Sequence, residues 1–158
     1  RDLHSFPTRR SSDLEMAKQL KFSAADTSNP VFHRLRSQMM TYANATGLAS
    51  IYTMAHRGGR LYFGPESLAE DDTLASVPGT LYQNPPQELI AIFSKHIGSV
   101  VVGPYADEYG TFISSFAPIV DPVTNEIIMV VGIDIDARSW LKDKLKERVK
   151  SFAALSLI

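Results

Sequence analysis

Residues 100–136, VVVGPYADEYGTFISSFAPIVDPVTNEIIMVVGIDID, form the most strongly patterned stretch of this 158-residue chain. They contain two apolar, β-branched and aromatic runs, 111–120 and 127–136, on either side of the turn-forming segment 121–125. Such runs around a short turn are typical of a long antiparallel hairpin. The stretch therefore predicts two paired strands at the centre of a sheet, and the second strand ends in the acids Asp134 and Asp136.

Three further strands are predicted upstream. Residues 50–57 and 60–63 flank Gly58-Gly59, a two-residue turn suited to positive φ angles, and so predict a second hairpin. Residues 99–102 predict a strand just before the long hairpin. The intervening segment, residues 64–84, has loop composition and is long enough to suggest a functional role.

Helices are predicted in the remaining segments. Residues 14–25 have the pattern of the end of a long N-terminal helix, and Asn29-Pro30 is a start signal for a second helix that ends at Gly47. A short amphipathic helix is predicted over 86–97, and an exit helix follows the last strand. The resulting order predicts an α+β, PAS-like domain with a five-stranded antiparallel sheet, because a doubly wound fold would alternate strands and helices.

Composition excludes several classes of protein. The chain has no cysteine, which excludes a disulfide scaffold, and its net charge of −1 gives no footprint for nucleic-acid binding. The charge is uneven: residues 15–136 carry 7 Lys and Arg against 13 Asp and Glu, whereas residues 137–150 carry 6 against 2. An acidic domain is thus expected to carry a basic exit helix.

The two ends of the chain call for separate interpretations. Residues 1–14 match the conceptual translation of a common sequencing-library adapter, so we exclude them from fold reasoning and expect the native N-terminus to be missing. Residues 141–158 are interpreted as an exit helix that leads into a truncated transmembrane segment, since 151–158 lack charge but are too short to span a bilayer. A docking or frayed helix end is the alternative.

The exit helix also predicts self-association. Leu141, Leu145, Val149 and Phe152 form an apolar seam at helical spacing, as in a helix that pairs with a copy of itself. We therefore expect a homodimer formed through this helix. Packing of the seam against the domain's own sheet is the alternative.

The long hairpin resembles the closing strands of Cache domains, the PAS-like extracytoplasmic sensor modules of bacterial receptors. The resemblance covers residues 30–140, within a sensor domain that we assign to residues 15–140. Its elements are a Gly-Pro-Tyr turn (103–105), an acidic and aromatic patch (107–109) before Gly-Thr (110–111), a strand ending in Ala-Pro-Ile (117–119), and the segment Val-Val-Gly-Ile-Asp (130–134).

This resemblance implies a sensor of small organic ligands, placed outside the inner membrane and linked to a histidine kinase, a diguanylate cyclase or a chemoreceptor output. Asp134 and Tyr105 match the positions where amino-acid-binding Cache domains use an Asp for the ligand amine and a Tyr beside it. The family's Arg-x-Trp pair has no counterpart, because the only Trp is Trp140. An amino acid, an amine and a carboxylate therefore all stay open as ligands.

The residues themselves also favour binding over catalysis. Strand alternation places Tyr52, Met54 and His56 on one face of the first strand and Arg57 on the other. Tyrosines near predicted turns and Asp134 would add enclosure and a counter-charge for a small ligand. The predicted ligand-binding residues are Asp134, Tyr105, Tyr52, Tyr62, Tyr109, Arg57 and His56.

Other interpretations of these residues stay open. Tyr52 and Tyr62 also suit the edge of a core, Arg57 suits a solvated turn, and Asp107 and Glu108 suit a hydrated surface loop. Strand pattern alone does not decide whether Ser114 or Ser115 shares a face with Asp134, since one residue of register exchanges them.

No catalytic residue, metal site or cofactor is expected. His33, His56 and His96 stand apart without metal-ligand spacing, and the glycine-containing turns lack a phosphate-binding pattern. Two alternatives to the sensor are a cytosolic PAS-like interaction module without a ligand and a small hydrolytic enzyme that uses Asp134 and Asp136.

Overall fold

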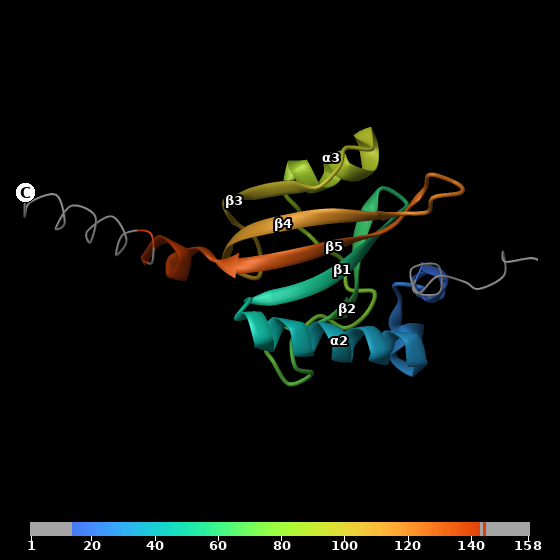
Figure 1. Ribbon diagram of the computed structural model, residues 1–158, viewed down its shortest axis with the longest axis horizontal. Helices are drawn as coiled ribbons and strands as arrows, with labels where there is room; N and C mark the ends of the chain where they lie inside the picture. The colour runs from blue at the N-terminus through green and yellow to red at the C-terminus, as the bar shows by residue number, and fades with distance from the viewer. Residues whose placement is uncertain (1–13, 143, 145–158) are drawn as a thin grey trace, which may run out of the picture.

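Five strands form one antiparallel sheet in the computed structural model, which describes residues 14–142 and 144 (Figure 1). The strand order is β2-β1-β5-β4-β3, so β5 lies at the centre and β2 and β3 form the edges. This confirms the predicted α+β, PAS-like class with a five-stranded antiparallel sheet. The strands are β1 (Ser50–Arg57), β2 (Arg60–Glu66), β3 (Val100–Ala106), β4 (Thr111–Val120) and β5 (Ile127–Asp136).

The long hairpin of β4 and β5 is present as predicted. Phe116 pairs with Gly132, and Ser114 pairs with Asp134 two residues further along. Asp121 begins the turn: its backbone N–H donates to the carbonyl of Glu126, and its carboxylate accepts from the N–H of Val123 at 2.8 Å. These local hydrogen bonds close the turn between the two apolar runs.

The β1–β2 hairpin is also confirmed, but β2 is longer than predicted. Gly58 and Gly59 have φ values of 54° and 79°, as a tight hairpin turn requires. Beyond Phe63 the strand continues through Pro65, and Glu66 pairs with Tyr52 after a shift in register. A proline is tolerated there because β2 is an edge strand and its free side needs no N–H donor.

The third strand differs from prediction in the same way. The Gly-Pro-Tyr segment was expected to form a turn, but it lies within β3 as an irregularity in register between Val102 and Tyr105. Gly103 has a φ of 121°, and a Cβ there would lie 2.6 Å from the carbonyl oxygen of Phe112. The glycine thus lets β3 bulge against β4 and continue, which carries Tyr105 into the sheet.

Two of the predicted helices are confirmed. Helix α2 (Pro30–Thr46) begins after Asn29, whose side chain accepts from the N–H of Val31 at 2.9 Å, and ends at Gly47 with a φ of 68°. Helix α3 (Gln87–Lys95) occupies the predicted amphipathic segment. In Figure 1, α2 runs along the β1–β2 side of the sheet and α3 lies beside β3.

The long N-terminal helix predicted over residues 14–25 is wrong. Only residues 14–17 are helical; turns follow, and then the short 3-10 helix η1 (Ala24–Ser28). The physical reason is Asp26, which is 1% exposed and accepts the N–H of Lys21 with both carboxylate oxygens at 3.0 Å. This contact folds the chain back before α2 begins.

Hydrophobic clusters cover both faces of the sheet. One contains Met54, Phe116 and Val130 and lies against α3; the other contains Ala55 and Met129 and is covered by the N-terminal segment and α2. Met54 and Ala55 are adjacent in β1 yet belong to different clusters, which confirms the predicted alternation of that strand.

The exit helix begins at Ala137, directly after β5, and is described over residues 137–142 and 144. Three residues of the predicted dimer seam, Leu145, Val149 and Phe152, lie outside the described residues, as do the apolar end 151–158 and residues 1–13. In the part of the chain that the structure describes, no helix is both long and apolar enough to cross a membrane.

Gly132 generates a prediction about the sheet. It pairs with Tyr52, and a Cβ at this position would lie 2.5 Å from Cε2 of the Tyr52 ring. We expect Gly132→Ala to lower the free energy of unfolding by about 1–3 kcal/mol, because the buried ring has to move. Urea unfolding measures the change. The matched control is Gly98→Ala, where a Cβ meets nothing within 4 Å; equal effects of the two substitutions would contradict this account.

Candidate ligand-binding site

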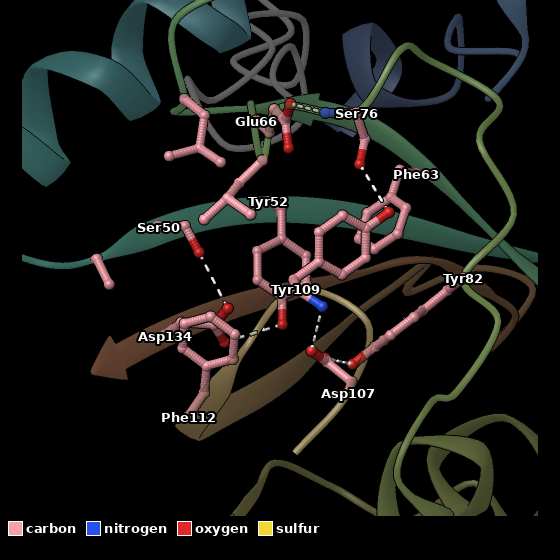
Figure 2. Close-up of a pocket in the computed structure, with 13 residues that line it drawn as sticks. Ser50, Tyr52, Phe63, Glu66, Ser76, Tyr82, Asp107, Tyr109, Phe112 and Asp134 are labelled. Carbon is pink, nitrogen blue, oxygen red and sulfur yellow. Dashed lines mark hydrogen bonds between the residues drawn. The ribbon is translucent and has the colours of Figure 1, made fainter. Parts of the chain in front are cut away.

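A cavity of about 80 Å³ lies between the sheet and the loop that follows β2 (Figure 2). Its walls come from β1, β2, β4 and β5, from the loop between β2 and α3, and from the turn between β3 and β4. This volume is below the range of drug-sized pockets, so the cavity suits a small ligand. The lining residues are Ala49, Ser50, Tyr52, Phe63, Glu66, Leu68, Leu74, Ser76, Tyr82, Asp107, Tyr109, Phe112 and Asp134.

The Asp134 carboxylate is one of the two buried carboxyl groups of the site, with 6% of the residue exposed. Its Oδ1 accepts from the hydroxyls of Ser114 at 2.6 Å and Tyr52 at 2.9 Å, and its Oδ2 accepts from the Ser50 hydroxyl at 3.0 Å. Tyr52 and Ser50 lie on β1 and Ser114 on β4, so both strands that flank β5 contribute donors. All three donors are neutral.

Burial sets the acid–base behaviour of this group. Desolvation raises the pKa of Asp134 above its usual range, and the hydrogen bonds from Ser114, Tyr52 and Ser50 act in the opposite direction. Burial, together with the charge of Asp134, also raises the pKa of the Tyr52 phenol well above 10, which keeps it a donor. The carboxylate is therefore hydrogen-bonded but has no positive partner among these contacts.

A chain of hydroxyl groups leads from Asp134 across the site. The Tyr105 hydroxyl lies 2.9 Å from Oγ of Ser114, and 3.4 Å from the hydroxyl of Tyr82. Tyr82 in turn donates to Oδ2 of Asp107 at 2.5 Å, while Oδ1 of Asp107 accepts the N–H groups of Tyr109 and Gly110. Asp134 and Asp107 are thus linked through side chains of β3, β4 and the loop.

The loop is fastened over the cavity at Ser76. Its hydroxyl lies 3.1 Å from the Tyr109 hydroxyl, and its N–H donates to Oε1 of Glu66 at 2.5 Å. Glu66 is 6% exposed, and desolvation raises its pKa to about 7 although the N–H of Ser76 and the charge of Arg36 oppose this. Glu66 therefore ionises near neutral pH at the point where the loop meets β2.

Four aromatic rings form a connected group beside these polar residues. The Phe63 ring packs against Tyr52, Tyr82 and Tyr109 with centroid separations of 5.6, 5.1 and 5.5 Å. Figure 2 shows these rings between the Asp134 and Glu66 ends of the site. Ring faces attract cations, and phenol hydroxyls exchange hydrogen bonds, so this wall suits an apolar or cationic ligand.

The site has acidic groups and no basic lining residue among the described parts of the chain. Asp134, Asp107 and Glu66 all line the cavity, whereas none of the described lining residues is Lys, Arg or His. Over residues 14–142 and 144 there is also no group of three His, Asp or Glu residues placed to hold a metal ion. The arrangement can therefore accept hydrogen bonds from a positively charged or polar guest.

The structure brings together four of the seven residues predicted for the site. Asp134, Tyr52 and Tyr109 line the cavity, and Tyr105 lies behind it, bonded to Ser114.

The other three lie elsewhere. Tyr62 packs in the cluster on the opposite face of the sheet, and the guanidinium of Arg57 lies 5.9 Å from the centroid of the Phe22 ring on that same face. His56 is exposed and stacks on Phe93 at 5.3 Å. Strand alternation places Tyr62 and Arg57 on the face opposite the cavity, and His56 lies at the turn end of the β1–β2 hairpin.

Several site residues escape prediction from sequence. Ser50 and Ser114 have no motif of their own. Asp107 belongs to the acidic and aromatic patch 107–109 but was interpreted as part of a hydrated surface loop; it instead faces the cavity and binds Tyr82. Pairing of Ser114 with Asp134 decides the register that the sequence leaves open. The only available signal is that Glu66 and Tyr82 bound the unusually long loop after the first hairpin.

Comparison with known proteins gives structural similarity alone. No family model matches, and no curated protein matches. Solved structures of the sensory domain of the Campylobacter jejuni chemoreceptor Tlp3 (CcmL) are similar: one superposes with a TM-score of 0.46 at 16% identity, covering 82% of this chain and 51% of that chain. Its complex with L-valine gives a TM-score of 0.47, 16% identity, and coverage of 82% and 50%. The present chain thus spans about half the length of these domains.

The two adjacent serines of β4 provide a matched test of the register. We expect Ser114→Ala to lower the free energy of unfolding by about 1–3 kcal/mol, since the buried Asp134 carboxylate loses its shortest hydrogen bond. Ser115→Ala, on the other face, is expected to change it by less than about 0.5 kcal/mol. Urea unfolding of both variants measures the two changes in the free energy of unfolding. A larger loss of stability in Ser115→Ala than in Ser114→Ala would show that the register is shifted by one residue.

Glu66 predicts a pH dependence of stability. Its pKa is raised in the folded protein, to about 7 from 4.5, so the folded state holds this proton more tightly than the unfolded state. The proton on Glu66 therefore contributes roughly 2–3 kcal/mol to the free energy of unfolding. This contribution is fully present below pH 4.5 and is lost as the pH rises through 7. Glu66→Gln is expected to remove this loss, because the amide oxygen still accepts from Ser76 and never ionises.

The measurement is the free energy of unfolding of both proteins at pH 5, 6, 7 and 8. The variant should gain stability relative to the wild type as the pH rises. Glu88→Gln, at an exposed position of α3, is the control. A constant difference between Glu66→Gln and wild type across this range would contradict the prediction.

Proposed function

We propose that this chain is a sensory domain that binds a small organic molecule in the cavity beside Asp134 and does not transform it. One observation carries the proposal: a buried carboxylate, held by neutral hydroxyls, lines a hollow that a long loop partly covers. A buried charge without a positive partner is costly, and a ligand that supplies this partner gains binding energy. The aromatic rings around Phe63 provide the apolar contact area.

Binding without catalysis is supported by the position of Asp136. Its Oδ1 accepts the N–H groups of Arg138 at 2.7 Å and Ser139 at 3.0 Å, so this carboxylate caps the exit helix. Asp136 does not line the cavity with Asp134. The pair that would serve a hydrolytic enzyme is thus divided between a binding wall and a helix start.

The same geometry supports signal transmission through β5. Asp134 lies in the site, and Asp136, two residues later, caps the helix that begins at Ala137. Phe112 lines the cavity and pairs directly with Asp136. We infer that a ligand which draws Asp134 and Phe112 together moves the end of β5, and that this shift biases the orientation of the exit helix.

The cellular setting extends the proposal. We infer that the domain is the extracytoplasmic sensor of a bacterial inner-membrane receptor, dimerises through the exit helix, and controls a histidine kinase, a diguanylate cyclase or a chemoreceptor. The Cache-like pattern of residues 103–134 supports this.

A ligand screen tests the proposed function. We expect at least one amino acid, amine or small carboxylate to raise the melting temperature of the protein by several degrees, and this shift to disappear in Asp134→Ala. Leu74→Trp, which enlarges a lining side chain and keeps the Asp134 carboxylate, should also abolish it. Asp71→Ala removes an exposed carboxylate and is the control. A broad metabolite screen that stabilises none of these proteins contradicts ligand sensing.

A further inference from the structure

The electrostatic character of the cavity points to a narrower class of ligand. The three ionisable acids on its wall, Asp134, Asp107 and Glu66, come from three different parts of the fold. In Figure 2 their carboxyl groups lie at separate points around the cavity, so a bound molecule meets an acceptor in several directions. A ligand carboxylate placed anywhere in this space has an acid nearby and, among the described lining residues, no basic side chain to pair with.

The one basic side chain associated with Glu66 is already engaged. Arg36 donates through Nη2 to the carbonyl of Leu68, and its Nη1 pairs with Oε1 of Glu70 at 3.0 Å. It lies along a separate hollow on the α2 side, which shares Glu66 and Ser76 with the candidate site. Arg36 does not line the cavity beside Asp134, and its guanidinium has its own partners.

Backbone donors near the acids are used as well. The N–H of Ser76 donates to Glu66, and those of Tyr109 and Gly110 donate to Asp107. The hydroxyls of Ser50, Tyr52 and Ser114 all donate to Asp134. These donors are thus directed at the protein's own acids, and two further lining hydroxyls, those of Ser76 and Tyr109, bond to each other.

We propose that the cavity selects a small primary amine that lacks a carboxylate, and that it discriminates against the corresponding amino acid. The inference rests on the proposed sensory function and narrows its ligand. The ammonium group would donate to Asp134 and lie against the ring group of Tyr52, Phe63, Tyr82 and Tyr109, where a cation is also attracted by the ring faces. The remainder of the ligand would contact Phe112, Leu68 and Leu74.

Sets of three compounds on one carbon frame test this. In the first set, isobutylamine carries the amine alone, valine carries both the amine and the carboxylate, and isovalerate carries the carboxylate alone. Two further sets repeat this order: ethanolamine, serine and 3-hydroxypropanoate; and phenethylamine, phenylalanine and 3-phenylpropanoate. Isothermal titration calorimetry of the full chain measures each dissociation constant. We expect an amine to bind at least about tenfold more tightly than the amino acid and the carboxylate of its set.

Variants tie the preference to the carboxylates. Asp134→Asn keeps an oxygen acceptor for Ser114 and Tyr52, places the amide NH2 beside the Ser50 hydroxyl, which can accept from it, and loses the charge. It is expected to weaken the best amine by at least about tenfold. Asp71→Asn makes the same change in net charge at an exposed position and should leave affinity unchanged. Circular dichroism of each variant checks that the fold is retained, and Glu66→Gln provides a second carboxyl variant within the cavity.

The outcomes separate this inference from the proposed function. An amino acid or a carboxylate that binds as tightly as its amine overturns the amine preference and leaves ligand sensing standing. Equal amine affinity in Asp134→Asn and wild type also overturns it, because the charge would then play no part. If none of the nine compounds binds but another metabolite raises the melting temperature, the amine preference is wrong and ligand sensing still stands. If no compound binds at all, the amine preference and ligand sensing are both wrong.

Discussion

Burial of the Asp134 carboxylate in the middle of the sheet is the constraint on which the rest of this structure depends. An ionised carboxyl cannot leave water without compensation, so neighbouring strands supply hydroxyl donors at Ser50, Tyr52 and Ser114. Tyr52 reaches it only because its partner in β5 is Gly132, whose missing side chain leaves room for the ring. The three hydroxyl donors and the glycine opposite Tyr52 thus all serve one buried carboxylate.

The same constraint links the cavity to its surroundings. The loop after β2 covers the site through Ser76, which contacts both Tyr109 and Glu66, and Tyr82 joins the loop to Asp107. One of these hydrogen bonds is donated by loop backbone, the N–H of Ser76, and the other two join side chains, so a guest in the cavity and the position of the loop affect each other. On the other side, β5 runs from Asp134 into the cap of the exit helix, which gives a short covalent route from site to helix.

Local pattern was sufficient for much of the fold. The five strands, α2 with its Asn29 cap and Gly47 end, and α3 follow from alternation, helical spacing and turn residues that act within a few positions of one another. Prediction failed where a distant contact overrides local preference. Asp26 folds back on Lys21 and ends the N-terminal helix, and cross-strand pairing extends β2 to Glu66 and carries β3 through Gly103-Pro104.

The sequence by itself determined that this protein is an α+β sheet domain without cysteine chemistry, and it singled out Asp134 as an acid at the end of an apolar strand. Only the tertiary structure decided which side chains meet it. Periodicity of two fixes the face of each residue within a strand, but register between strands is set by packing over the whole sheet. The choice of Ser114 over Ser115, and the meeting of Asp107 with Tyr82, arise from contacts between residues 20 to 25 positions apart.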